Sequence, residues 1–365
     1  MQASTISLQV GTVRLASPLV VSPMAGMTDT AFRRLVKRHG GCGLVVTEMV
    51  SSEGLVRGID RTLEYAEYTE EERPVSIQIF GGDPDRMAEA ARIVEGMGAD
   101  LVDVNMGCPV PKISKHHAGC SLMREPAHAA AIIKSMAKAV KIPVTVKMRK
   151  GWDDHEQTAP EVARRVEDAG AAAITIHGRT AKQSYSGIAD WDFVARVAEA
   201  LTIPVFGSGD CIHPEQIVDR LARSTSASAP ARAGVSGVFV GRGVLRNPWI
   251  LAQAQDLLEG RSARVVSDEE RGRFLLEYID LLQNERVHEE TGFRHAIAVE
   301  DGSAPPVGTP RHDRWVINKV RALCSWYTKG LDNGSHLRTH VNQAQSLGEL
   351  QDLIAAFFRL AAVSA

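Results

Sequence analysis

The stretch PVTVKMR, residues 143–149, decides the fold because it is a strand pattern with two unlike faces. Successive side chains of a strand point to opposite faces, so Val146 and Met148 share one face while Lys147 and Arg149 share the other. We expect the apolar face to pack against helices. The polar face would then point into the interior of a closed sheet.

The same kind of short β-rich run recurs along the first two thirds of the chain, at intervals of 25 to 42 residues. Each interval leaves room for one helix, as in residues 28–41, where Thr28 or Asp29 is a candidate N-cap and two glycines end the pattern. Eight such βα units in about 250 residues predict an α/β fold, the (β/α)₈ or TIM barrel. The runs are PLVVSP at 18, GLVVTE at 43, VSIQIF at 75, LVDVNM at 101, PVTVKM at 143, AITIHG at 173, PVFGSG at 204 and GVFVGR at 237.

Strand patterns end after about Gly260, and the rest of the chain is predicted to form a smaller all-helical domain. We place the barrel in residues 1–258 and the helical domain in residues 259–365. Two stretches rich in Ser, Ala and Pro, residues 222–234 and 300–314, are predicted surface insertions. The amphipathic helical patterns cover residues 269–290, 314–331 and 346–363.

The composition is that of a globular chain: of 365 residues 44% are hydrophobic, and the formal net charge is −2. The amino terminus, MQASTISLQVGTVRL, lacks a basic region followed by an apolar run, and no segment reaches the roughly 20 uncharged apolar residues that span a bilayer. We therefore expect a cytoplasmic protein. The cysteines are odd in number and lack CxxC spacing, which indicates reduced thiols rather than disulfides or a zinc ribbon. They are Cys42, Cys108, Cys120, Cys211 and Cys324.

Active sites of such barrels form at the carboxyl ends of the strands, so the residues that follow each run are the candidates. Every run except the first ends in a polar or charged group. We predict that these groups gather in one mouth. They are Pro23 and Met24, Glu48, Gln78, Asn105 and Cys108, Lys147 and Arg149, His177 and Arg179, Ser208, Gly209 and Asp210, and Gly241 and Arg242.

Lys147 needs an anion, because an isolated ammonium is very costly to bury in a dry core. One interpretation is a salt bridge to Asp103 or Glu48 on neighbouring strands. The other interpretation is a bound ligand. The turns GSGD (207–210) and GRG (241–243) favour the ligand, because glycines let backbone N–H groups approach an anion and phosphate sites of barrels usually lie at strands 7 and 8.

FMN is a ligand with this layout. Its phosphate would occupy the glycine turns, with Arg242 as a charged donor. Lys147 would face the N1 and C2 carbonyl edge, where negative charge accumulates when the flavin is reduced, and Gln78, Asn105 and His177 would lie across the middle. The alternative is that the glycines form ordinary tight turns.

The turn after the fourth run, NMGCP (105–109), carries the thiol of Cys108. An unperturbed thiol has a pKa of about 8.5 and is mostly protonated at neutral pH, so Cys108 is a candidate proton donor beside a reduced flavin. The alternatives are a packing residue, a thiolate nucleophile activated by a neighbouring lysine or histidine, or a metal ligand together with His116, His117 and Cys120. The spacing C-x7-H-H-x2-C matches no standard metal site, so we expect no metal.

Six motifs, in their order and spacing, resemble those of the bacterial tRNA-dihydrouridine synthases. The resemblance covers essentially the whole barrel, and WYTKGL (326–331) extends it into the helical domain. The asparagine-x-glycine-cysteine-proline element is specific, whereas GRG alone is not. The motifs are SPMAGMTD, SIQIFGGDP, DVNMGCPVPK, TVKMRKGWDD, IHGRT and VFVGRGVLRNPW.

The resemblance implies an FMN enzyme that uses NADPH to reduce the C5–C6 bond of particular uridines in tRNA, with hydride passing from flavin N5 to C6 of the uracil. It implies that Cys108 donates the proton to C5. It also implies that Asn105, Arg149 and Tyr185 contact the target uracil. The residues that it implies for flavin binding are Pro23, Met24, Ala25, Gln78, Lys147, His177, Ser208, Gly209, Asp210, Gly241 and Arg242.

The chain departs from the family pattern at two places. Ser208 stands where the family usually has asparagine, and we expect weaker hydrogen bonding but retained FMN, because the backbone donors remain. His116 and His117 stand where the family tends to have basic and small residues, in a loop that would touch the RNA differently.

The segment 311–340 is basic, with six Lys or Arg against two acids, and contains Trp315, Trp326 and Tyr327. It is predicted to contact the RNA backbone. The alternative is a solvated helix face whose aromatic residues are core. Competing functions are a dehydrogenase of a free pyrimidine similar to dihydroorotate dehydrogenase, an RNA-binding barrel without catalysis, and an aldolase-type lysine at Lys147. We assume a monomer.

Overall fold

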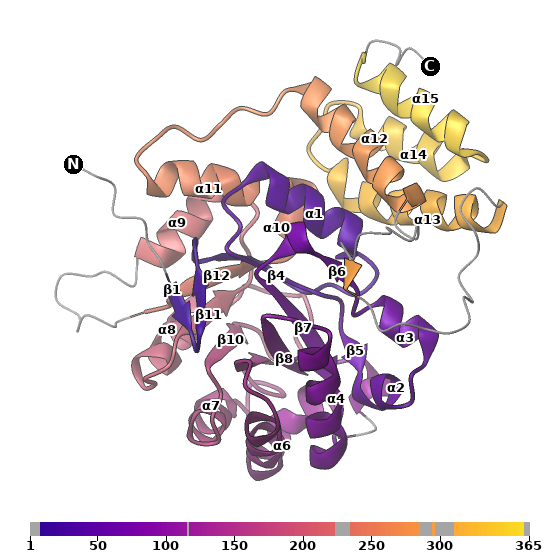
Figure 1. The fold of residues 1–365 in the computed structure, drawn as a ribbon. Helices are drawn as coiled ribbons and strands as arrows, with labels where there is room; N and C mark the ends of the chain where they lie inside the picture. The colour runs from indigo at the N-terminus through magenta and orange to yellow at the C-terminus, as the bar shows by residue number, and fades with distance from the viewer. Residues whose placement is uncertain (1–7, 115–116, 223–233, 285–293, 296–309, 361–365) are drawn as a thin grey trace.

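The computed structural model describes residues 8–114, 117–222, 234–284, 294–295 and 310–360, and its centre is a closed barrel of eight parallel strands (Figure 1). Each strand pairs with the next one along the barrel, and β12 pairs with β3 to close the ring. The eight predicted runs form these strands, so the prediction of a TIM barrel is confirmed. The strands are β3 (Leu19–Val21), β4 (Leu44–Val46), β7 (Val75–Phe80), β8 (Leu101–Met106), β9 (Val144–Arg149), β10 (Ala173–His177), β11 (Val205–Ser208) and β12 (Gly237–Val240).

Helices surround the barrel and connect its strands (Figure 1). The first of them, α1, follows Asp29, whose side chain accepts a hydrogen bond from the Phe32 N–H at 3.0 Å, and it is ended by Gly40 at a φ of 89°. Asp29, and not Thr28, is therefore the N-cap of the helix predicted in residues 28–41. The barrel helices are α1 (Thr30–His39), α2 (Ser52–Val56), α3 (Asp60–Glu64), α4 (Pro84–Gly96), α5 (Pro111–Ser114), α6 (Pro126–Ala139), α7 (Ala159–Asp168), α8 (Trp191–Glu199), α9 (Pro214–Ala222), α10 (Arg242–Arg246) and α11 (Ile250–Leu258).

An antiparallel hairpin of β1 (Leu8–Val10) and β2 (Val13–Leu15) packs against the amino-terminal half of the barrel interior. Val10 of this hairpin belongs to the same apolar cluster as Phe206 and Phe239, whose ring centres lie 5.3 Å apart. The sequence patterns do not predict this hairpin. The other short elements are β5 (Val50–Ser51), β6 (Tyr68–Thr69), β13 (Arg294–His295) and the 3₁₀ helices η1 (Glu70–Glu72) and η2 (Gly119–Arg124).

The barrel strands have an apolar outer face and an inner face that becomes polar toward their carboxyl ends. In β9, Val146 and Met148 are fully buried in the core that includes the surrounding helices, whereas Thr145 and Lys147 are only half-buried. This is the alternation predicted for residues 143–149. Because the strands are parallel, their polar ends meet at one mouth.

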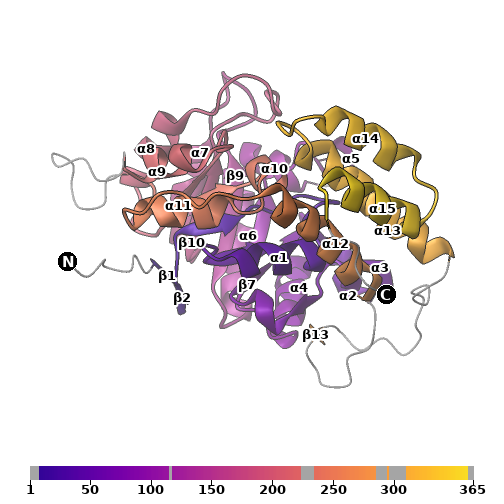
Figure 2. The same ribbon diagram turned by 90° about the horizontal axis from the view of Figure 1, so that it is seen from above.

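Four further helices lie together at one side of the barrel, next to α1 (Figures 1 and 2). Three of them overlap the predicted helical patterns, and α14 is an additional helix. The predicted insertions at 222–234 and 300–314 fall largely outside the described residues. Among the described residues, none of the helices has the length and apolar content of a membrane span. The four helices are α12 (Asp268–Asn284), α13 (Pro310–Tyr327), α14 (Gly334–Gln343) and α15 (Leu347–Phe357).

A buried ion pair joins α1 to η1. The Nε atom of Arg33 lies 2.5 Å from the carboxylate of Glu72, and both side chains are almost inaccessible to water. The Arg33 guanidinium also donates to the carbonyl oxygens of Thr28 and Glu67, at 2.7 and 2.9 Å. Removing one partner of such a pair leaves a buried charge without compensation.

We predict that Arg33→Met lowers the free energy of unfolding by roughly 3–5 kcal/mol, because Glu72 loses its buried cation. Urea unfolding followed by circular dichroism measures the loss. Arg165→Met is the matched control: it removes an exposed ion pair with Glu161 and is expected to cost less than about 1 kcal/mol. Equal losses in the two variants would contradict this account of the ion pair.

Candidate active site at the mouth of the barrel

The strand register brings the predicted side chains together at the mouth. Gln78 of β7 lies opposite Asp103 of β8, and Asn105 of β8 lies opposite Lys147 of β9. Side chains from neighbouring strands therefore form a continuous polar surface at the carboxyl ends. This is the position at which TIM barrels build their active sites.

Gln78 and Asn105 form a hydrogen-bonded row across two strands. Gln78 Nε2 donates to Asp103 Oδ2 at 2.7 Å, and Gln78 Oε1 accepts from Asn105 Nδ2 at 2.8 Å. The other oxygen of Asp103 accepts from the Thr145 hydroxyl at 2.6 Å. Burial raises the pKa of Asp103, and these neutral donors lower it by less. The network fixes the orientation of both amides.

Asn105 also shapes the turn that carries Cys108. Its Oδ1 accepts the backbone N–H groups of Gly107 and Cys108, at 3.0 and 2.9 Å. A short amide side chain can reach the backbone two and three residues further along the chain, as in an Asx turn. The asparagine therefore fixes the place of the thiol at the mouth.

Burial raises the pKa of the Cys108 thiol, and the nearby charges of Arg149 and Lys147 lower it by less. The thiol is thus protonated at neutral pH. A thiolate nucleophile requires the opposite shift, a lowered pKa. The environment of Cys108 therefore suits a proton donor better than a nucleophile.

The histidines after Cys108 are only partly described. His117 is exposed, and its Nδ1 lies 3.0 Å from Glu125 rather than beside the thiol. Lys115 and His116 lie outside the described residues. Within the part of the chain that the structure describes, no group of three or more His, Cys, Asp or Glu is arranged to hold a metal ion.

Lys147 has no carboxylate at ion-pair distance among the described residues. The sequence offered Asp103 and Glu48 as its partners. Asp103 accepts hydrogen bonds from neutral donors. The Oε1 atom of Glu48 lies 3.6 Å from the Nζ atom of Lys319. Burial, together with the charge of Arg149, lowers the pKa of Lys147 to about 8. The ammonium is thus charged at neutral pH, and its position suits a bound anion.

Arg149 ties two loops of the mouth together. Its Nε donates to the carbonyl of Gly107 at 2.8 Å, and its Nη1 donates to the carbonyls of Thr180 and Ser184, both at 2.9 Å. The loop after β10 thereby presents Tyr185, which is 60% exposed and has its ring centre 5.9 Å from Arg149 Cζ. Within the described part of the chain, Nη2 of Arg149 makes no hydrogen bond, which leaves this nitrogen for a ligand.

His177 ends β10 in a positively charged neighbourhood. Burial is the main cause that lowers its pKa well below the usual value, followed by the charges of Lys147, Arg149, Arg179 and Arg242. The imidazole is therefore neutral at pH 7. Its Nε2 lies 3.4 Å from Nη1 of Arg179.

Arg179 holds the turn after β11. Its Nη2 donates to both carboxylate oxygens of Asp210, at 2.7 and 2.9 Å, and its guanidinium also donates to the carbonyls of Ser186 and Gly187. Asp210 accepts a third hydrogen bond, from the Ala189 N–H at 2.6 Å. The carboxylate of Asp210 is thus engaged within the protein, so this predicted site residue supports the turn. Arg179, which was not among the predicted ligand contacts, is its partner.

The two glycine turns approach each other closely. Gly209 has a φ of 131°, a conformation that side-chain-bearing residues rarely adopt. A Cβ at Gly243 would lie 2.0 Å from the carbonyl oxygen of Cys211, so glycine is required there. A Cβ at Gly241 would meet nothing closer than Met24 Sδ at 3.5 Å. A Cβ there would make ordinary van der Waals contacts, so the backbone around Gly241 is less crowded than the backbone around Gly243.

Arg242 stands between the glycine turns and Tyr185. Its Cζ lies 4.8 Å from the Tyr185 ring centre, and its Nη2 lies 3.9 Å from Asp210 Oδ1. Ser208, the departure from the family pattern, is buried, and its carbonyl accepts the Gly178 N–H at 3.2 Å. The end of β11 is thus held by a backbone hydrogen bond that does not depend on the side chain at position 208.

The loop after β3 forms another part of the mouth. Pro23 and Met24 are half-buried and Ala25 is exposed. The N–H of Gly26 donates to Glu48 Oε2 at 2.6 Å, so Glu48 anchors this loop from the end of β4. The position of Glu48 at a strand end was predictable, but no local sequence signal shows that it binds this loop.

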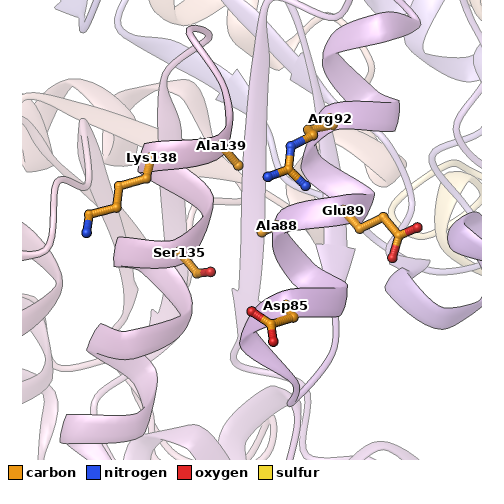
Figure 3. Close-up of a pocket in the computed structure, with 7 residues that line it drawn as sticks. All are labelled: Asp85, Ala88, Glu89, Arg92, Ser135, Lys138 and Ala139. Atoms are coloured by element: carbon orange, nitrogen blue, oxygen red, sulfur yellow. The ribbon is translucent and has the colours of Figure 1, made fainter.

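An open groove of about 470 Å³ lies on the outside of the barrel, between α4 and α6 (Figure 3). Its lining mixes acidic, basic and small side chains. None of the candidate residues belongs to it, so it is separate from the mouth. The lining residues are Asp85, Ala88, Glu89, Arg92, Ser135, Lys138 and Ala139.

The architecture places the protein in the class of TIM-barrel proteins. A solved structure of histamine dehydrogenase from Rhizobium sp. 4-9 aligns with this chain at a TM-score of 0.51 and 12% identity, and covers 76% of this chain and 51% of its own. At this identity the likeness concerns the fold alone.

Sequence comparisons identify the family. A family model described as dihydrouridine synthase (Dus) matches residues 19–300. The probable tRNA-dihydrouridine synthase of Rickettsia conorii is 35% identical over 96% of both chains, and the probable tRNA-dihydrouridine synthase 1 of Synechocystis sp. is 37% identical over 95% of this chain and 88% of its own. The tRNA-dihydrouridine synthase B of Xanthomonas campestris is 39% identical over 69% of this chain and 73% of its own. The chain belongs to the dihydrouridine synthase family.

Proposed function

We propose that the protein is an FMN-dependent tRNA-dihydrouridine synthase, an oxidoreductase that uses NADPH to reduce the C5–C6 bond of specific uridines in tRNA. Family membership supports the general activity. The observation that carries the assignment for this chain is the protonated thiol of Cys108, whose turn is held at the mouth by Asn105. The ammonium of Lys147 lies at the same mouth. The proposed place of action is the cytoplasm.

The mouth fits FMN in its charge. Lys147 offers a cation without a carboxylate partner among the described residues, and Gly241 precedes the helix that begins with the cationic Arg242. Bound FMN would supply the hydride that passes from its N5 to C6 of the uracil. The residues proposed to hold it are Pro23, Met24, Ala25, Gln78, Lys147, His177, the segment Ser208, Gly209 and Asp210, and Gly241 with Arg242.

Asn105, Arg149 and Tyr185 are proposed to bind the target uridine. The exposed ring of Tyr185 can stack on a base that has left the RNA helix. Nη2 of Arg149 is available for a uracil carbonyl. Nδ2 of Asn105 donates to Gln78 Oε1 at 2.8 Å and to Met49 Sδ at 3.7 Å, and a base would replace the weaker contact with sulfur.

Cys108 is proposed to protonate C5 of the uracil. Its raised pKa keeps the proton on sulfur until a stronger base, the carbon that gains electrons at C5, is presented. The charges of Arg149 and Lys147 then stabilise the thiolate that remains, since both favour the ionised form of Cys108. Water can return the proton afterwards.

We propose that residues 1–258 form the catalytic barrel and that residues 259–365 bind tRNA. Within the described residues, Lys319, Arg321 and Arg338 have ion-pair or hydrogen-bond partners in the protein, which leaves a smaller charged surface than the sequence suggests. Tyr327 is fully buried and serves the core, as the alternative interpretation holds. The exposed basic residues are Arg311, Arg314 and Lys329.

We predict that Cys108→Ala leaves the reduction of FMN by NADPH unchanged and slows dihydrouridine formation by about 10²- to 10⁴-fold, because only proton delivery is lost. Anaerobic stopped-flow absorbance measures the first step, and mass spectrometry of digested tRNA measures the second. Cys42→Ala removes a half-buried thiol outside the mouth and is the control, with both rates expected at the wild-type level. Dihydrouridine formation by Cys108→Ala at the wild-type rate would contradict the proton-donor role.

We predict that FMN reduction by NADPH slows above pH 8 in the wild type, by about tenfold for each pH unit. Lys147 has a pKa lowered to about 8, so it is a cation below this pH and loses the charge that stabilises reduced FMN above it. Stopped-flow traces over pH 6 to 10 would test this.

Lys147→Arg is the control for this pH dependence, because a guanidinium stays charged over the whole range. Its profile is expected to be flat above pH 8. Identical profiles for the wild type and Lys147→Arg would show that another group titrates.

A further inference from the structure

A lysine of the helical region reaches two carboxylates at the mouth of the barrel. The Nζ of Lys319, on α13, lies 3.0 Å from Asp29 Oδ2 and 3.6 Å from Glu48 Oε1. The side chains of Lys319, Asp29 and Glu48 are 15%, 9% and 5% exposed. Water screens such a cluster weakly, so its interactions are stronger than those of surface ion pairs.

The two carboxylates fix the loop between β3 and α1. Glu48 Oε2 accepts the Gly26 N–H at 2.6 Å, in the middle of the loop that carries Met24. Asp29 Oδ1 caps α1 at the end of this loop, and Asp29 Oδ2 accepts the hydroxyl of Tyr278, on α12, at 2.8 Å. Both α12 and α13 therefore contact groups that hold the loop.

Lys319 supplies the positive charge at this place. Burial raises the pKa of Glu48, and the nearby carboxylate of Asp29 raises it further. Among the groups that lower this pKa, Lys319 has the largest effect. Arg33 is the other cation nearby, but its guanidinium is paired with Glu72. Without Lys319, two buried carboxylates would face each other beside the loop, with a cost in repulsion and desolvation.

We propose that Lys319 is a positioning residue of the cofactor site, and that the helical region completes this site by holding the loop 23–28 through Glu48 and Asp29. The inference rests on the proposed function, because this loop contains Pro23, Met24 and Ala25, three of the residues assigned to FMN. According to this inference, the helical region contributes to the binding of FMN as well as to the binding of tRNA.

The test is the affinity for FMN in the absence of tRNA and NADPH. The full chain is stripped of FMN, and the dissociation constant is measured from the quenching of flavin fluorescence. Lys319→Met is expected to raise this constant by at least about tenfold, because the loop loses the charge that holds its two anchors. Lys319→Arg keeps the charge and is expected to recover most of the affinity.

Arg273→Met is the matched control, since Arg273 lies on α12 of the same helical region, has a side chain that is 64% exposed and pairs only with Glu269 among the ion pairs of the described residues. It removes the same charge and is expected to leave the dissociation constant for FMN unchanged. Glu48→Ala removes the hydrogen bond that anchors Gly26. It is also expected to raise the dissociation constant for FMN about tenfold. If Lys319→Met does not fold, this variant tests whether the loop anchor supports FMN binding.

Two outcomes separate this inference from the proposed function. Wild-type affinity for FMN in both Lys319→Met and Glu48→Ala overturns the inference and leaves the proposed function in place. A wild-type protein that does not bind FMN overturns the proposed function itself. An equal loss of affinity in Arg273→Met and Lys319→Met would show that the net charge of the helical region decides the affinity, and it would also overturn the positioning role.

Discussion

A lysine ammonium that points into a closed barrel is the constraint on which the rest of the site depends. The alternation of β9 directs the Lys147 side chain into the barrel. Because the ring of strands is closed, this side chain can reach a ligand only at the mouth. Asp103, the acid on the neighbouring strand, is already satisfied by neutral donors. The positive charge therefore remains for a bound anion, and the glycine turns and Arg242 lie at the same mouth.

Side chains at or just beyond the carboxyl ends of the strands fix the geometry of the mouth. Asn105 holds the turn of Cys108, Arg149 joins this turn to the loop of Tyr185, and Arg179 joins that loop to the turn after β11. Each contact uses a directional hydrogen bond to a carbonyl, an N–H group or a carboxylate. A mouth built in this way is preorganised, so little order has to be imposed when a ligand binds.

The strands and the mouth were predictable from the sequence because both follow from local periodicity and from the rule that parallel strands end on one side. Helix α14 was not predictable, because Leu337 and Val341 are its only large buried apolar residues and give a weak pattern. The contact of Lys319 with Glu48 was not predictable either, because the two residues are distant in the sequence and nothing local selects the partner.

The central claim is that this chain reduces uridines in tRNA. Its most direct test is a map of dihydrouridine, position by position, in tRNA from cells with and without the gene, and in the deficient tRNA after treatment with the purified protein and NADPH. The account predicts that at least one position loses dihydrouridine without the gene and regains it in the treated tRNA. A complete set of dihydrouridines in the cells that lack the gene, together with no dihydrouridine formed by the purified protein on unmodified tRNA, would contradict it.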